Sequence, residues 1–323
     1  MKAVSLFSGC GGADLGLRGK FHFNGKGYSS NGVEIVHASD IDSKSVLTYN
    51  QNFEIPALIA DVKNLHFGLH SADIVIGGFP CQSFSSVNPT KNPFDSRGQL
   101  YNEFVRVVQE IEPRFFVGEN VRGFFSLKGG FFFKDFEAKM KKTGYRVCHA
   151  ILRAADYGVP QLRDRLFVVG VRNDLPREFI FPHPLFGDGS RDRIPYVPIA
   201  SFLDDHAEVG EKYYFSQRAV DGVKRAKKNM KRALAQDPNG PSLTLTSHLA
   251  KVSLNSRDPV LLVDARRERY RRFTPREAAR LQSFPESFSF AGSESDAYRQ
   301  IGNAIPPVVM WHIARAAKRI LRP

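Results

Sequence analysis

Short apolar runs alternate with helical patterns over the first 180 residues, and this alternation limits the folds open to the chain. Strands that alternate with helices form a mostly parallel sheet covered on both faces, with ligands at the carboxyl ends of the strands. We therefore predict a doubly wound α/β domain over residues 1–182. The expected strands are residues 2–7, 33–38, 57–60, 74–76, 115–117 and 166–171, and the expected helices are residues 13–17, 43–52, 100–111 and 132–142.

This regularity stops near residue 182. Residues 183–272 are rich in proline and glycine in places and show little periodicity, which predicts a second, smaller domain. Inside it, residues 216–234 have helical spacing with basic side chains mostly on one face, and a solvated helix face is the favoured interpretation. Helical patterns return at residues 275–282 and 305–321.

The charge of the chain points to a polyanionic partner. Its 46 basic and 33 acidic residues give a net charge of +13, so nucleic acid is the leading candidate. No apolar run approaches the roughly 20 residues of a membrane span, and we expect no membrane partner. Cys10, Cys81 and Cys148 are odd in number and far apart, which favours a reducing cytoplasm.

A glycine turn follows the first expected strand. Gly9, Gly11 and Gly12 lack the spacing of a dinucleotide fingerprint, so a cofactor without phosphates fits better. Asp40 follows the second strand, where it can accept from ribose hydroxyls, and Asp61 follows the third, where it can accept from an adenine amino group. S-adenosylmethionine needs both contacts. Each residue taken singly is more often part of a tight turn or a helix cap.

A cysteine stands at the exit of the fourth expected strand. Two glycines break the strand, and Cys81 follows directly after Pro80. An isolated cysteine is usually a small buried hydrophobe. At this edge of the sheet, next to a rigid proline, it is a candidate nucleophile. The loop behind it, residues 86–98, offers Lys91 and Arg97 as phosphate contacts, although a passive surface loop is an equal alternative.

Six ordered motifs resemble those of the bacterial DNA (cytosine-5)-methyltransferases, and the resemblance covers nearly the whole chain outside residues 183–272. The motifs are residues 7–12, 78–85, 119–121, 161–165, 272–280 and 302–303.

The resemblance implies four catalytic residues. Cys81 matches the nucleophile that attacks C6 of cytosine, so that C5 can take the methyl group. Glu119 matches the carboxyl group that contacts N3 and the exocyclic amine, and burial would raise its pKa as that role requires. Arg163 and Arg165 match the arginine pair that supports the site, with Arg165 at the O2 atom of the base.

The resemblance also implies S-adenosylmethionine as cofactor, S-adenosylhomocysteine as product and no metal. Asn303 would bring residues 273–323 back to the catalytic domain and complete the cofactor pocket. The matching cofactor positions are Phe7, Gly9, Gly11, Gly12, Asp40, Ile41, Asp61, Val62, Pro80 and Asn303.

Double-stranded DNA is the implied partner, with a cytosine flipped out of a specific site. Residues 183–272 would be the target-recognition domain, and the expected DNA contacts are Gln82, Ser85, Arg97, Thr244 and Thr246. We expect a monomer in the bacterial cytoplasm, associated with the nucleoid. A cognate restriction endonuclease would fit a restriction-modification system, but the sequence does not establish one.

Two departures and three alternatives accompany this interpretation. The link at residues 18–32 is longer and richer in glycine than usual, and Phe79 stands where many members have proline. A tRNA cytosine-5 methyltransferase would carry the same motifs, but the roughly 90-residue variable region favours DNA. A catalytically silent DNA-binding protein is disfavoured because every chemical residue is present, and the glycine turn argues against a nicotinamide-dependent oxidoreductase.

Overall fold

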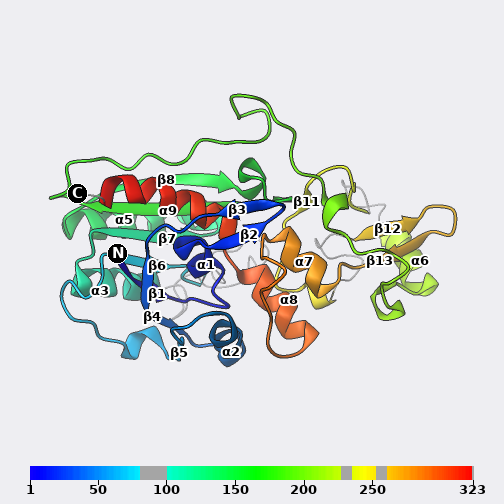
Figure 1. Cartoon of the computed structure of the whole chain (residues 1–323), viewed down its shortest axis with the longest axis horizontal. Helices are drawn as coiled ribbons and strands as arrows, with labels where there is room; N and C mark the ends of the chain where they lie inside the picture. The colour runs from blue at the N-terminus through cyan, green and yellow to red at the C-terminus, as the bar shows by residue number, and fades with distance from the viewer. Residues whose placement is uncertain (81–99, 227–234, 252–259, 322–323) are drawn as a thin grey trace.

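A seven-stranded sheet organises the computed structural model, which describes residues 1–80, 100–226, 235–251 and 260–321 (Figure 1). The strand order is β5-β4-β1-β6-β7-β10-β8. The pairs from β5 to β7 are parallel, whereas β10 runs antiparallel to both β7 and β8. The predicted mostly parallel α/β sheet is therefore confirmed. Its strands are β1 (Lys2–Leu6), β4 (Glu34–Asp40), β5 (Leu58–Ile59), β6 (Ile74–Gly77), β7 (Phe115–Asn120), β8 (Tyr145–Arg153) and β10 (Asp164–Arg172).

Helices bury apolar side chains on both faces of this sheet, which gives two hydrophobic clusters. One cluster contains residues of α1, α2 and α9, and the other contains residues of α3 and α5. The spacing of apolar residues in the sequence predicted these helices because each buries one stripe. Their bounds are α1 (Gly12–Arg18), α2 (Ser43–Asn52), α3 (Leu100–Ile111), α5 (Phe131–Lys142) and α9 (Pro307–Leu321). A short helix that was not predicted, α4 (Arg122–Ser126), lies between β7 and α5.

Several elements of the structure were not predicted from the sequence. Strand β8 has mixed burial along its length, so it shows neither an apolar run nor a strict alternation. The glycine-rich link at 18–32 contains a hairpin of β2 (Phe21–Phe23) and β3 (Lys26–Tyr28), whose alternate aromatic side chains are buried. Helix α8 (Glu294–Asn303) begins with a capping box at Ser293.

The region 183–272 contains short elements beside the main sheet. In Figure 1, α6 (Gln217–Ala226), β12 (Leu261–Asp264) and β13 (Arg269–Arg271) lie together at the end of the molecule away from the sheet. Helix α6 confirms the first part of the helix predicted over residues 216–234, and residues 227–234 lie outside the described residues. Strand β11 (Ser242–Leu243) instead pairs with β9 (Gln161–Leu162), and α7 (Pro275–Leu281) follows the region.

No helix in the described ranges is long and apolar enough to cross a membrane.

Candidate functional site

The glycine turn after β1 is held by the end of the neighbouring strand. Phe7, Gly9 and Gly11 have φ angles of 52°, 56° and 93°, a region that favours glycine and strains phenylalanine. The N–H of Gly9 donates to Asp40 Oδ2 at 2.8 Å, and the N–H of Asp42 donates to Asp40 Oδ1 at 2.9 Å. The Asp40 carboxylate thus fixes the turn while each oxygen keeps capacity for a second hydrogen bond.

The surroundings of this turn offer both apolar and polar contacts. Burial raises the pKa of Asp40, and the backbone N–H groups that it accepts from oppose that shift. Ile41 is 71% exposed beside it, which is unusual for a large aliphatic side chain. Asp61 accepts from the N–H of Lys63 at 3.1 Å and caps a short 3₁₀ helix, while Val62 is buried.

The C-terminal segment packs directly on the glycine turn. A Cβ atom at Gly12 would lie 2.6 Å from the carbonyl oxygen of Ile305, so the close approach requires glycine. Gly16 stands against the carbonyl oxygen of Pro307 in the same way. Asn303, at the end of α8, is exposed. Residues 305–307 therefore lie against the start of α1.

The exit of β6 lies beside the exit of β7. Gly77 pairs with Gly118, and a Cβ atom at Gly78 would lie 3.2 Å from Oε2 of Glu119. Asn120 donates from Nδ2 to the carbonyl oxygen of Phe79 at 3.2 Å and so fixes the backbone just before Pro80. The remaining residues expected here lie outside the described residues: Cys81, Gln82, Ser85 and Arg97.

Glu119 and Arg165 form an ion pair at this edge. Oε1 of Glu119 lies 3.1 Å from Nε of Arg165, and the side chains are 12% and 17% exposed. Burial raises the pKa of Glu119, and the positive charges of Arg165 and Arg163 oppose the shift. Arg165 can reach Glu119 because β10 runs antiparallel to β7, which places the start of β10 beside the end of β7.

Arg163 is buried, and its guanidinium binds backbone carbonyl oxygens. Its guanidinium donates to the carbonyl oxygens of Leu245, Gly302 and Ala304 at 3.1, 2.9 and 3.1 Å. It therefore joins the segment after β11 to the end of α8.

Thr244 and Thr246 lie on that segment. Thr244 donates from Oγ1 to the carbonyl oxygen of Leu162 at 2.7 Å, and Thr246 Oγ1 accepts from the N–H of His248 at 3.1 Å. Both side chains are partly exposed. The structure thus places Thr244 against β9, close to Arg163, and the backbone of Thr246 against Gly302.

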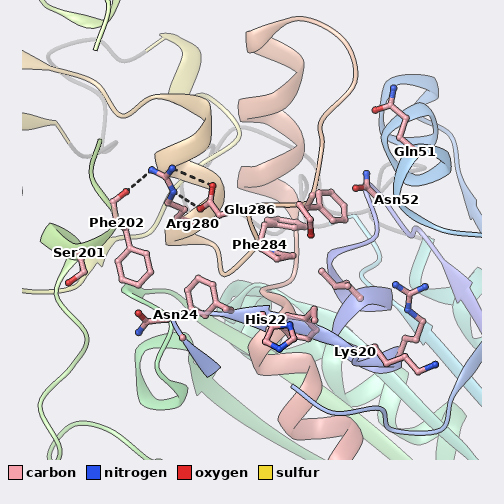
Figure 2. Close-up of a pocket in the computed structure, with 18 residues that line it drawn as sticks. Lys20, His22, Asn24, Gln51, Asn52, Ser201, Phe202, Arg280, Phe284 and Glu286 are labelled. Carbon is pink, nitrogen blue, oxygen red and sulfur yellow. Dashed lines mark hydrogen bonds and ion pairs between the residues drawn. The ribbon is translucent and has the colours of Figure 1, made fainter. Parts of the chain in front are cut away.

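A cavity of about 730 Å³ opens between the β2–β3 hairpin, the end of α2 and residues 284–288 (Figure 2). Of the expected catalytic, cofactor and DNA-contact residues that the structure describes, none lines it. In its wall, Arg280 donates to the carbonyl oxygen of Phe202 at 3.2 Å and forms ion pairs with Asp204 and Glu286. These contacts tie the start of the variable region to the segment after α7.

Asn120, Gln161 and Gly302 lie within the sequence motifs, but no role was predicted for them. Gln282 appeared only as the last residue of the helix expected at 275–282. All four residues make contacts with distant segments, and no local pattern in the sequence marks such contacts. Among the residues that the structure describes, no group of three or more His, Cys, Asp or Glu side chains could hold a metal ion.

A mostly parallel sheet with a glycine turn, a half-buried carboxylate at the end of the next strand and an acid–arginine pair at the same edge is typical of an α/β methyltransferase. The chain belongs to the C-5 cytosine-specific DNA methylase family, whose model matches residues 1–319. It is therefore an S-adenosylmethionine-dependent enzyme that methylates C5 of cytosine in DNA.

Named relatives agree with this family. The Type II methyltransferase M.FnuDI of Fusobacterium nucleatum is 32% identical over 99% of this chain and 95% of its own length. The Type II methyltransferase M.NgoPII of Neisseria gonorrhoeae is 30% identical, with 99% and 96% covered. The solved structure of the Entamoeba histolytica methyltransferase EhMeth has a TM-score of 0.74 at 18% identity and covers 100% of this chain and 99% of its own, which supports the fold.

Proposed function

We propose that Cys81, Glu119 and Arg165 carry out the methylation of a cytosine flipped out of a specific double-stranded DNA site. The observation that carries the proposal is the buried ion pair of Glu119 and Arg165, 3.1 Å apart, beside the backbone that leads to Cys81. A carboxyl group with a raised pKa and a fixed guanidinium suit a base whose ring gains electrons.

Each of these three side chains has its own role in the proposed reaction. The Cys81 thiolate attacks C6 of cytosine and forms an S–C6 bond, while the electron pair of the C5–C6 double bond moves toward N3. Glu119 gives its proton to N3 and neutralises that charge. Arg165 orients the base through its O2 atom. After C5 is methylated, solvent water takes the C5 proton, the electron pair of that C–H bond restores the C5–C6 double bond and expels the Cys81 thiolate, and N3 returns its proton to Glu119.

The cofactor residues fit S-adenosylmethionine, which supplies an electrophilic methyl group on its sulfonium. A Cβ atom at Gly9 would meet nothing within 4 Å, so the turn is open on that side. Asp40 can accept from two ribose hydroxyls, and exposed Ile41 offers an apolar surface for the adenine. Phe7, Gly11, Gly12, Asp61, Val62, Pro80 and Asn303 complete the proposed pocket.

Residues 183–272 are the proposed target-recognition domain, with residues 1–182 and 273–323 as the catalytic part. Thr244 and Thr246, together with Gln82, Ser85 and Arg97, are the proposed DNA contacts. We further propose a monomeric enzyme that acts with a cognate restriction endonuclease.

Bisulfite sequencing of DNA from a host that expresses the protein tests this function. We expect 5-methylcytosine at one recurring sequence, abolished by Cys81→Ser because the hydroxyl is a far weaker nucleophile. Cys148→Ser is the matched control, since Cys148 lies on β8, at the edge of the sheet, and should keep full methylation. Methylation above a trace by a folded Cys81→Ser protein would refute the covalent role.

A further inference from the structure

Three buried polar side chains connect the proposed DNA-contact segment to the proposed cofactor segment. Gln161 and Gln282 are 0% exposed and Arg163 is 2% exposed. Nε2 of Gln161 donates to Oε1 of Gln282 at 2.6 Å and to the carbonyl oxygen of Leu281 at 3.0 Å. Hydrogen-bonded networks in a buried setting hold their members in one arrangement. We call these three residues the polar junction.

The polar junction forms hydrogen bonds with the backbone N–H and the carbonyl oxygen of Leu245. Oε1 of Gln161 accepts from the Leu245 N–H at 2.9 Å, and Arg163 donates to the Leu245 carbonyl oxygen at 3.1 Å. Leu245 lies between Thr244 and Thr246, so the two proposed DNA contacts flank a residue whose backbone N–H and carbonyl oxygen are both bonded to the polar junction.

The same junction forms hydrogen bonds with the carbonyl oxygens of the residues on both sides of Asn303. Gln282 donates from Nε2 to the carbonyl oxygen of Ala304 at 2.6 Å, and Arg163 donates to that oxygen and to the carbonyl oxygen of Gly302. A Cβ atom at Gly302 would overlap the backbone of Thr246. The two segments therefore touch without any intervening side chain.

We propose that the polar junction couples cofactor binding to DNA binding, with Gln282 as a positioning residue. This inference rests on the proposed roles of Asn303 and Thr246. Any ligand that fixes Asn303 also fixes residues 244–246 through the junction, so each ligand favours the arrangement that the other needs. Such coupling is reciprocal, because each ligand must change the affinity for the other by the same factor.

Gln282→Met tests the coupling with little risk to the fold. The methionine is close in size, and among the described contacts the Ala304 carbonyl oxygen keeps Arg163 while Gln161 Nε2 keeps Leu281. Gly302→Ala is the second variant, since its methyl group pushes residue 246 away without touching Gln282. Asn31→Leu is the matched control: Asn31 is also a buried amide that donates to two backbone carbonyl oxygens, those of Gly16 and Leu17.

The measurement is the dissociation constant for a duplex that carries the methylated sequence, with and without saturating S-adenosylhomocysteine. We expect the ligand to tighten DNA binding by about fivefold or more in the wild type and in Asn31→Leu, the range typical of coupled sites. In Gln282→Met and Gly302→Ala the ratio should fall below about twofold. In steady-state kinetics, Gln282→Met should raise the KM for S-adenosylmethionine more than it lowers kcat.

A wild-type ratio of one, or an unchanged ratio in both folded variants, would overturn the inference. The proposed cofactor role of Asn303 is tested separately, because Asn303→Ala should weaken S-adenosylhomocysteine binding in the absence of DNA. An unchanged affinity there would refute that contact, whereas the ratio in Gln282→Met would still decide whether the junction couples the sites.

Discussion

The buried carboxyl group of Asp14 lies in the first turn of α1, next to the glycine turn, and should make stability depend on pH. Ser5 donates to its Oδ2 at 3.0 Å and Tyr49 donates to its Oδ1 at 3.2 Å, and the side chain is fully buried. Burial raises the pKa of Asp14 from 3.8 to about 6, against the hydrogen bonds from these hydroxyls. The folded state thus holds the proton more tightly than the unfolded state.

The sign and size of the effect follow from this shift. Stability from the bound proton is complete below pH 3.8 and is lost as the pH rises through about 6. A shift of this size corresponds to about 3 kcal/mol in total, of which about half is lost between pH 5 and pH 8. Asp14→Asn carries no charge at any pH, and the two hydroxyls can rotate to serve its amide.

Urea denaturation of wild type and Asp14→Asn between pH 5 and pH 8 checks the reasoning. Carboxyl groups other than Asp14 titrate in both proteins, so their contributions cancel in the difference. The free energy of unfolding of the variant should rise relative to wild type by about 1.5 kcal/mol across this range. A difference that stays constant with pH would refute the buried, raised-pKa carboxyl group.

Three further predictions concern the reaction and its target. Glu119→Gln should lower kcat by about 10²- to 10⁴-fold, because the amide cannot give a proton to N3. The kcat/KM of the wild type should fall as the pH rises through the raised pKa of Glu119, and this fall should be absent in the variant. A pH profile of both proteins measures the two effects. Duplexes with the target cytosine mispaired should bind at least as tightly as paired ones in a gel-shift titration, and weaker binding would count against flipping. Exchange of residues 183–272 for those of a relative should change the methylated sequence in bisulfite maps, and retention of the original sequence would place specificity elsewhere.

Local patterns predicted most of the fold. Helix α2 was expected at residues 43–52 and α3 at residues 100–111, and both have these bounds. Each presents a stripe of buried side chains at helical spacing, which the sequence displays directly. Strand β8 was not predicted because it lies at the edge of the sheet, where mixed burial leaves neither an apolar run nor a strict alternation in the sequence.

The site was predictable only where its residues follow directly from a strand end. Asp40 was expected at the end of the second strand because parallel strands bring their carboxyl ends to one edge. The antiparallel direction of β10 brings Arg165 to Glu119. This direction was not predicted, because an apolar run in the sequence does not show which way the strand runs. The three carbonyl oxygens held by Arg163 come from positions 82 to 141 residues further along the chain, and no short-range pattern records such contacts.

These long-range contacts explain why the cofactor turn depends on both ends of the chain. Gly12 admits the carbonyl oxygen of Ile305, Gly16 admits that of Pro307, and the Cys10 thiol lies 3.9 Å from the carbonyl oxygen of Gln300. A glycine turn alone leaves its backbone free to move, which is costly for a site that must orient a ligand. Here α8 and α9 close one side of the turn and Asp40 fixes the other, so among the described residues the turn stays open near Gly9, where the cofactor is proposed to bind. The variable region is therefore inserted between two parts of the chain that must meet, and the polar junction stands where it rejoins them.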